Sequence, residues 1–210
     1  MSNHAALMDS VYRYQRYIYD FTRKYYLFGR DRLIDELRPK SGARIVEVGC
    51  GTARNLIRIA RRYPDAVLFG VDASDAMLDT AAKAIARAGL TGRIRLAHGY
   101  AEELSPAMFG EAAPFDDVVF SYSLSMIPDW KGSLAAARSA LASGGWIHIV
   151  DFGDLTGFAG PMRAALLAWL KLFHVAPRTE LQAALEGKPG DFRVLTGRYA
   201  FLFHGAGPAF

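Results

Sequence analysis

The sequence is poor in cysteine, with Cys50 as the only one among 210 residues. A single thiol cannot close an internal disulfide, and it excludes a cysteine-rich metal site. Cys50 stands between two glycines, where a small side chain fits a tight turn. We therefore expect Cys50 to fill space rather than to act as a nucleophile, and we predict no metal centre.

Long apolar runs are also missing, since no stretch reaches the roughly 20 residues that a membrane-spanning helix needs. The first residues lack the charged start and apolar block of a signal peptide, so we expect a cytoplasmic protein. Repeats, linkers and low-complexity segments are absent. The charge excess is small, with 25 Lys and Arg against 21 Asp and Glu, so the placement of the cations matters more than their number.

What is present is a 51% hydrophobic composition over a length typical of one globular domain with a substantial core. We predict a single domain with four parts. These are a helical cap at 1–38, a ligand-binding core at 43–152, a helical lid or insert at 153–190, and a hairpin of strands at 191–205.

A glycine-rich turn follows the apolar segment 44–48 and precedes a predicted helix. Gly49 and Gly51 allow a sharp turn and the close approach of a ligand, because they carry no Cβ. Glu47 precedes the turn, and Asp72 ends the next apolar strand 25 residues later, where a carboxylate can bind both hydroxyls of a ribose. The pattern indicates a nucleotide-like ligand, although a nicotinamide site or a tight turn without a ligand also fits the glycine spacing.

Apolar strands and amphipathic helices alternate along the chain, which indicates an α/β fold with a parallel sheet and helices on both faces. Gly144 and Gly145 are interpreted as a turn into a strand, and Ser74 as a helix N-cap. Two further strands are expected around Gly197, within 192–204. The other predicted strands are 44–48, 67–71, 93–97, 116–121 and 146–150, and the predicted helices are 53–62, 75–87 and 131–141.

Glu47-x-Gly49-x-Gly51 with a downstream Asp72 resembles the motif of class I methyltransferases that use S-adenosylmethionine (SAM). That family usually has a third glycine where this chain has Ala53, which we expect to be the first residue of the helix. The resemblance implies a Rossmann-like fold with a seven-stranded, mostly parallel sheet, an antiparallel last strand and an N-terminal helical cap. It also implies SAM as the cofactor and S-adenosylhomocysteine (SAH) as the product.

The same resemblance implies which residues contact SAM. Met77 is expected to lie against the adenine as a polarizable wall, and the Ser121 carbonyl to accept from the methionine amine. Family members often have an acid on the adenine where this chain has Tyr100. The full set of predicted cofactor contacts is Tyr17, Tyr19, Glu47, Gly49, Gly51, Asp72, Ala73, Met77, Gly99, Tyr100, Ala101 and Ser121.

Methyl transfer mainly requires that the nucleophile be held in line with the donor, since a sulfonium is already a good leaving group. An amine must lose its proton before it attacks, and the methylated cation is attracted by tyrosine rings. We predict Tyr122, Tyr19 and Asp151 as catalytic residues, and we expect His148, inside a strand, to be structural. The loop that begins at Ser121 lacks the Asn/Asp-Pro-Pro-Tyr block of enzymes that act on adenine or glutamine, so a nucleic-acid partner is not expected.

The N-terminal segment 5–37 is predicted to be helical, with a break near Gly29. One face is apolar and the other is cationic, so the helix can bind an anionic membrane surface, pack on the domain as a cap over SAM, or do both. The apolar face consists of Val11, Tyr14, Ile18, Phe21, Tyr25 and Phe28, and the cations are Arg13, Arg16, Arg23 and Lys24.

Segment 157–190 also allows two interpretations. Met162, Leu166, Trp169 and Phe173 form one helical stripe. The stripe either covers the core or forms a substrate lid or a dock for acyl chains. At roughly 13 residues the helix is too short to cross a bilayer.

Several stretches of the chain resemble bacterial betaine-lipid N-methyltransferases. The resemblance implies successive methylation of the amine of diacylglyceryl-homoserine, a lipid head-group substrate, by a peripheral protein at the inner face of the membrane. Alternatives are phosphatidylethanolamine N-methylation, a soluble small-molecule or quinone methyltransferase, and a SAM-binding protein without turnover. The stretches are Ala5-Ala-Leu-Met-Asp9, Tyr12-Arg13, Tyr17-Ile-Tyr-Asp20, Gly29-Arg-Asp-Arg-Leu-Ile34 and Gly51-Thr-Ala-Arg-Asn-Leu56.

Overall fold

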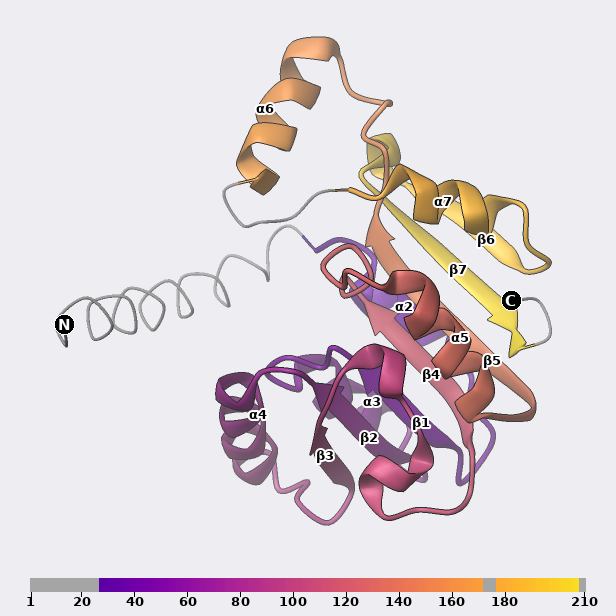
Figure 1. Ribbon diagram of the computed structural model, residues 1–210. Coiled ribbons are helices and arrows are strands. Elements are labelled where there is room, and N and C mark those ends of the chain that lie inside the picture. Colours follow the sequence, from indigo (N-terminus) through magenta and orange to yellow (C-terminus); the bar gives the residue numbers. More distant parts are fainter. Residues whose placement is uncertain (1–26, 172–176, 208–210) are drawn as a thin grey trace, which may run out of the picture.

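A seven-stranded sheet forms the centre of the computed structural model, which describes residues 27–171 and 177–207 (Figure 1). The strands lie in the order β3-β2-β1-β4-β5-β7-β6. The four pairs among β1 to β5 are parallel, and β7 is antiparallel to both β5 and β6. The predicted Rossmann-like sheet is confirmed. The strand bounds are β1 Arg44–Val48, β2 Val67–Asp72, β3 Ile94–His98, β4 Phe115–Ser121, β5 Leu141–Phe152, β6 Asp191–Leu195 and β7 Ala200–Ala206.

Helices cover both faces of the sheet because successive strand residues point to opposite sides. Ile45 of β1 packs with α2, α3 and α4, whereas the next residue, Val46, packs with α5, α7, η1 and η2. Each face therefore has its own hydrophobic core. The helices are α2 Arg30–Glu36, α3 Arg54–Arg62, α4 Asp75–Arg87, α5 Trp130–Ala140, α6 Gly160–Lys171 and α7 Thr179–Glu186, and the short 3₁₀ turns are η1 Ala101–Glu103, η2 Pro106–Phe109 and η3 Thr196–Arg198.

Strand β5 begins much earlier than predicted, at Leu141 instead of residue 146. Leu141 pairs with Phe115 and Trp146 pairs with Asp117, so the register shifts between these two pairs. Gly144, with φ +78°, lies in the extra chain. The glycine pair is therefore a bulge within a long strand rather than a turn before it, because the neighbouring strand extends the pairing.

The C-terminal hairpin is confirmed, with β6 and β7 joined through η3. Gly197 in this connection has φ +60°, and a Cβ there would lie 2.7 Å from the Phe158 ring. Of the predicted helical cap, α2 is described, whereas Tyr17, Tyr19 and the cations between Arg13 and Lys24 lie outside the described residues.

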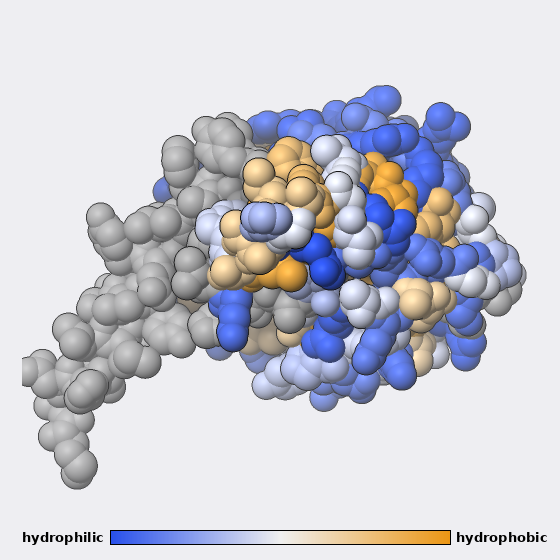
Figure 2. Space-filling model, turned by 90° about the horizontal axis from the view of Figure 1, so that it is seen from above, coloured by the Kyte–Doolittle hydropathy of each residue, from blue (hydrophilic) through white to orange (hydrophobic). Residues whose placement is uncertain are grey.

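Helix α6 lies beyond the carboxyl ends of the central strands (Figure 1). Leu166 and Trp169 pack against the core and Leu170 is fully buried, but Met162 is 56% exposed. Apolar residues gather on this end of the molecule (Figure 2). Only part of the predicted stripe thus covers the core, and its last member, Phe173, lies outside the described residues. Within 27–171 and 177–207, no helix is long and apolar enough to cross a membrane.

Candidate functional site

The turn between β1 and α3 is built on two glycines in the left-handed backbone region. Gly49 has φ +71° and Gly51 has φ +52°, which residues with a Cβ adopt only at a cost. A Cβ on Gly49 would lie 2.7 Å from the Ser123 Cβ. The N–H groups of Gly49 and Cys50 donate to the Val71 carbonyl at 2.8 and 3.1 Å, and these bonds tie the turn to the end of β2.

The expectation that Ala53 begins the helix is wrong. Helix α3 starts at Arg54, and Ala53 is its N-cap in the left-handed conformation, with φ +61°. The family's third glycine adopts this conformation freely, whereas alanine pays roughly 1–2 kcal/mol. The Ala53 methyl group is fully buried, and its packing offsets part of that cost.

A cavity of about 330 Å³ adjoins this turn. Its size lies at the lower end of small-molecule sites, which span roughly 300–1,000 Å³. It brings together four of the predicted cofactor contacts: Glu47, Gly49, Gly51 and Ser121. The sequence pattern did not assign the other lining residues to the site. These are Leu27, Arg30, Cys50, Thr52, Arg54 and Asn55.

Glu47 is a buried carboxylate in this cavity, only 2% exposed. Its Oε1 accepts a 2.7 Å hydrogen bond from Asn55 Nδ2, while Oε2 is buried without a hydrogen-bond partner. Burial raises the pKa of Glu47 to about 7, although the Asn55 bond and the charge of Arg30 oppose the shift. A buried, unsatisfied carboxylate oxygen suits a cationic group of a ligand.

Asn55 is held toward Glu47 by Arg54, the preceding residue of α3, which is itself paired with α2. Arg54 Nη1 donates to Asn55 Oδ1 at 3.0 Å, and Arg54 Nη2 pairs with Asp31 of α2 at 2.8 Å. Because the amide oxygen is occupied, the amide nitrogen faces Glu47. A polar residue in the first turn of the helix after the glycines is the signal that would have found Asn55. Arg30 gave no such signal, because only tertiary packing brings α2 to the cavity.

Asp72 lies at the carboxyl end of β2, next to the glycine turn. Its Oδ2 accepts from the Gly51 N–H at 2.8 Å, and its Oδ1 accepts from the Ser74 N–H at 2.9 Å. An ionised carboxylate has further lone pairs, so ribose hydroxyls can still donate to it. The predicted N-cap role of Ser74 is confirmed, since its hydroxyl accepts from the Met77 N–H.

Five other predicted cofactor contacts, from Ala73 to Ala101, lie near the carboxyl ends of β2 and β3 and do not line the cavity. Ala73 is exposed, and its carbonyl lies 3.1 Å from His98 Nε2. Met77 is half-buried in the first turn of α4. The described cofactor contacts thus fall into a cavity group, a second group near the ends of β2 and β3, and Asp72, which lies beside the glycine turn without lining the cavity.

The loop after β3 holds the rest of the second group. Gly99 is buried against Met108, because a Cβ on Gly99 would collide with the Met108 methyl group. The side chain of Tyr100 is 55% exposed, whereas Ala101 is buried at the start of η1.

Tyr122 does not border the cavity as expected for a catalytic residue. Its side chain is 2% exposed, and its hydroxyl donates to the Phe28 carbonyl at 2.6 Å. The ring packs edge-on against Phe152, with 4.6 Å between centroids. The ring face is therefore not open to a methylated cation, and the expected contact is corrected.

Asp151 is also withdrawn from the surface, with no exposed area. Its two carboxylate oxygens accept from the N–H groups of Phe152 and Ser125 at 2.8 and 3.0 Å. Burial raises the pKa of Asp151 to about 6. These bonds hold the loop after β4 against β5 and leave Asp151 in the interior, contrary to its expected contact with an amine. Tyr19, the third predicted catalytic residue, lies outside the described residues.

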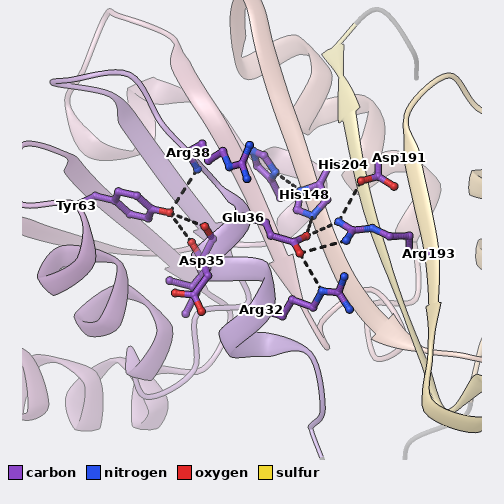
Figure 3. Close-up of polar contacts among 10 residues, drawn as sticks. Arg32, Asp35, Glu36, Arg38, Tyr63, His148, Asp191, Arg193 and His204 are labelled. Carbon is purple, nitrogen blue, oxygen red and sulfur yellow. Dashed lines mark hydrogen bonds and ion pairs between the residues drawn. The ribbon is translucent and has the colours of Figure 1, made fainter.

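His148 belongs to a polar network that meets α2 at Glu36, the last residue of the helix (Figure 3). Its Nδ1 lies 2.7 Å from His204 Nδ1, and its Nε2 lies 3.0 Å from Asp117 Oδ1. His204 Nε2 lies 3.3 Å from Glu36, which also pairs with Arg193. The network joins α2 to strands β4 to β7, in line with the structural role expected for His148. Among the described residues, no group of three or more His, Cys, Asp or Glu side chains could hold a metal ion.

Comparison with known proteins shows the family to which this chain belongs. A family model described as a methyltransferase domain matches residues 45–145. The aklanonic acid methyltransferase of a Streptomyces species is 33% identical over 166 residues, which cover 77% of this chain and 67% of that protein. The chain belongs to the class I SAM-dependent methyltransferases. Its cofactor is therefore SAM.

Other relatives are longer than this chain. A ubiquinone/menaquinone biosynthesis C-methyltransferase of Geobacter sulfurreducens is 29% identical over 145 residues, or 64% of this chain and 53% of that protein. A trans-aconitate 2-methyltransferase of Streptomyces avermitilis is 37% identical over 110 residues, or 51% of this chain and 38% of that protein. The chain thus spans about two fifths to half of the length of these two relatives.

Solved structures share the fold at low sequence identity. A SAM-dependent methyltransferase from Aquifex aeolicus has a TM-score of 0.64 at 15% identity, covering 88% of this chain and 92% of that one. The SAM-dependent methyltransferase SibL, in its apo form, has a TM-score of 0.68 at 21% identity, covering 90% of this chain and 57% of that one. These likenesses show the fold alone.

Proposed function

We propose that this protein transfers methyl groups from SAM to the head-group amine of a lipid, with diacylglyceryl-homoserine as the substrate and the trimethylated betaine lipid as the product. The observation that supports a lipid is the exposed apolar surface of α6. The choice of the homoserine lipid rests on the stretches that resemble betaine-lipid N-methyltransferases. The cavity supports the use of SAM.

The residues of the cavity, together with Asp72 beside the glycine turn, fit SAM. Glu47 Oε2 would accept from the ammonium of the methionine part, the left-handed Gly49 leaves room beside it, and Asp72 would hold the ribose. SAM supplies a methyl group on a positively charged sulfur. The protein's contribution is to fix the donor, exclude water and align a neutral amine with the methyl group. Asp151 is buried, so we propose that the amine loses its proton to water.

Helix α6 exposes several apolar residues to solvent. Pro161, Met162, Ala164, Ala165 and Ala168 are exposed, and only Leu170 is fully buried. A surface helix of a soluble domain usually presents a polar face to water. Clustered apolar residues at the surface mark protein, ligand or membrane contacts. Because α6 lies beyond the carboxyl ends of the strands, a lipid held on it would enter from the side of the cofactor turn (Figure 1).

Cations accompany this apolar surface. Arg163 is half-buried and Lys171 is exposed on α6. We propose that they, together with the cationic N-terminal segment outside the described residues, attract an anionic bilayer and hold the protein there peripherally.

A soluble acceptor is the second candidate, and the relatives favour it. The three reported relatives bear the names of aklanonic acid, quinone biosynthesis and trans-aconitate methyltransferases. Under this reading α6 would be a lid over a small organic substrate instead of a bilayer contact.

Product analysis separates these candidates. Purified protein would be incubated with SAM and vesicles that contain either diacylglyceryl-homoserine or phosphatidylethanolamine, and in parallel with soluble trans-aconitate. We expect mono-, di- and trimethylated homoserine lipid by mass spectrometry, and none with Gly49→Val, whose side chain would collide with Ser123. Methylation of the soluble acid without any lipid product would refute the proposal.

A charge placed on α6 tests the bilayer contact. We expect Ala168→Glu to weaken flotation with anionic phosphatidylglycerol vesicles severalfold, because a carboxylate would enter an anionic surface. Ala82→Glu is the matched control, since Ala82 is an exposed alanine on α4, far from α6. Equal flotation of both variants and the wild type would exclude α6 from the contact.

A further inference from the structure

Tyr122 has a backbone conformation that is rare for its residue type. Its φ is +56°, in the left-handed region that costs a bulky residue about 1 kcal/mol or more. The residue directly follows Ser121, which lines the cofactor cavity. The conformation turns the Tyr122 side chain inward, where it is 2% exposed. Strained residues persist where surrounding contacts hold them, so the contacts of Tyr122 identify what the strain maintains.

These contacts form a ring of four aromatic residues that includes Phe28, in the segment that leads into α2. The Tyr122 ring meets Phe152 at 4.6 Å, Phe152 meets Tyr199 at 5.8 Å, and Tyr199 meets Phe28 at 5.4 Å, all edge-on. The Tyr122 hydroxyl closes this ring of residues by donating to the Phe28 carbonyl at 2.6 Å. The ring of Phe28 is therefore held by Tyr199, next to the start of β7, and its carbonyl by Tyr122, next to the end of β4.

The held segment carries two residues of the cavity. Leu27 and Arg30 lie on either side of Phe28 and Gly29, and both line the cavity with Glu47. Gly29 has φ +86°, and a Cβ there would lie 2.4 Å from Leu195 Cδ1. The segment therefore passes through a narrow space, and a shift at Phe28 would move Arg30 relative to Glu47.

We infer that Tyr122 is a positioning residue of the cofactor site: by holding the Phe28 carbonyl, it fixes Leu27 and Arg30 against the part of the cavity that contains Glu47. The inference rests on the part of the proposed function that places SAM in this cavity, and not on the identity of the methyl acceptor. It assigns Tyr122 a role in cofactor binding, where the sequence pattern had suggested contact with the transferred methyl group.

The electrostatics of Tyr122 agree with this role. Burial raises the pKa of the Tyr122 hydroxyl well above its usual range, and the charge of Asp151 adds to the shift. The phenol therefore stays protonated and donates, as the bond to Phe28 requires. A proton acceptor for a substrate amine would need the opposite state.

Tyr122→Phe tests the inference, because it removes the hydroxyl and keeps the ring. We expect the Kd for SAH, measured by calorimetry, to rise about fivefold to tenfold, because losing one hydrogen bond to the part-buried Phe28 carbonyl would loosen Leu27 and Arg30. At saturating SAM, kcat should stay within about twofold of wild type, because no group on the reacting atoms is lost. Hydrogen exchange should accelerate at the Leu33 amide, which donates to the Gly29 carbonyl.

Tyr63→Phe is the matched control. The Tyr63 hydroxyl also donates to a backbone carbonyl, that of Ile34 in α2, at 2.8 Å, but Tyr63 does not line the cavity. We expect a comparable loss of thermal stability with an unchanged Kd for SAH. Wild-type affinity in Tyr122→Phe, or a reduced kcat with unchanged affinity, would overturn the inference. Weaker SAH binding by Tyr122→Phe, together with no methylation of any lipid amine by the wild type, would support the inference and refute the proposed function.

Discussion

At the scale of single residues, Glu47 is a buried carboxylate in a cavity. One of its oxygens accepts a hydrogen bond, and the other has no hydrogen-bond partner. Burial holds the pKa of Glu47 at about 7 in the free protein, so the carboxyl group is largely protonated below that pH. A ligand cation binds the ionised form and must displace the proton when the group is neutral. Cofactor binding and proton release are therefore linked at this residue.

This linkage predicts a pH-dependent affinity. The Kd for SAH should be nearly constant above pH 7.5 and should rise toward tenfold per pH unit below pH 7, because each bound ligand must then release the Glu47 proton. Calorimetry between pH 5.5 and 8.5 would measure it. Glu47→Gln should bind SAH more weakly and with a flat profile from pH 6 to 8. An equal slope in both proteins would show that another group is responsible.

Two opposing contributions to stability at Ala53, backbone strain and the burial of its methyl group, are similar in size. Ala53→Gly removes left-handed strain of roughly 1–2 kcal/mol, but it also removes a fully buried methyl group worth about 0.8 kcal/mol and loosens the unfolded chain. We expect the free energy of unfolding in urea to change by less than about 1 kcal/mol. Ala60→Gly is the control, since Ala60 lies inside α3 and is equally buried, and it should lose about 1–2 kcal/mol. Equal losses would contradict the strain argument.

Site residues that belong to one local sequence motif could be predicted from the sequence. Glu47, Gly49 and Gly51 flank one turn, and the structure brings them to one cavity. Tyr122 could not be placed in the same way, because its inward orientation depends on a left-handed backbone and on contacts with Phe28, which is distant in the chain.

At the scale of elements, α2 depends on tertiary contacts. It has seven residues, fewer than an isolated helix needs for stability in water. Tyr63 bonds to its Ile34 carbonyl, and Glu36 at its end meets both Arg193 and His204 (Figure 3). The network therefore holds one end of α2, while the opposite end carries Arg30 into the cavity.

The network predicts an acid-sensitive contribution from His204. Burial and the neighbouring His148 lower the pKa of His204 to about 4, although Glu36 opposes the shift. In the unfolded chain His204 binds a proton near pH 6.5, whereas in the folded protein it stays neutral until about pH 4. Stability is therefore lost as pH falls from about 6.5 toward 4. His204→Gln should remove a loss on the order of 1–2 kcal/mol between pH 7.5 and 5, measured by urea unfolding.

The deciding quantity in this experiment is the difference in pH dependence of stability between the wild type and His204→Gln. Glu47 and Asp151 have raised pKa values in the folded state, so they contribute the opposite slope in both proteins. The charged groups around the imidazole pair (Asp117, Glu36, Arg193 and Asp191) are also common to both. Identical pH slopes would show that His204 does not carry this linkage.

Most element bounds were predictable because apolar periodicity is local. Helix α4 was predicted without error, and the first four strands were predicted to within one residue at each end. Strand β5 was not, since its first residues pair with Phe115 through a bulge that depends on β4. For α6, the sequence pattern showed an apolar stripe but not which residues of the helix face the core.

At the scale of the whole molecule, the sheet order places the ends of β1, β2 and β4 together, so the glycine turn, Asp72 and the Ser121 loop meet at one edge. Helix α6 stands beyond the same edge (Figure 1). This arrangement follows from the alternation of strands and helices, which the sequence displays. The acceptor does not follow from it, because a few side chains around one cavity decide the substrate while the fold serves many.

The most direct test of the account is a crystal structure of this protein with SAH. We predict that the ammonium of the homocysteine part lies within hydrogen-bond distance of Glu47 Oε2, and that the ribose hydroxyls lie on Asp72. Leu27 and Arg30 should border the same end of the ligand. SAH bound at another place, or bound here with Glu47 Oε2 still lacking a partner, would contradict the central claim.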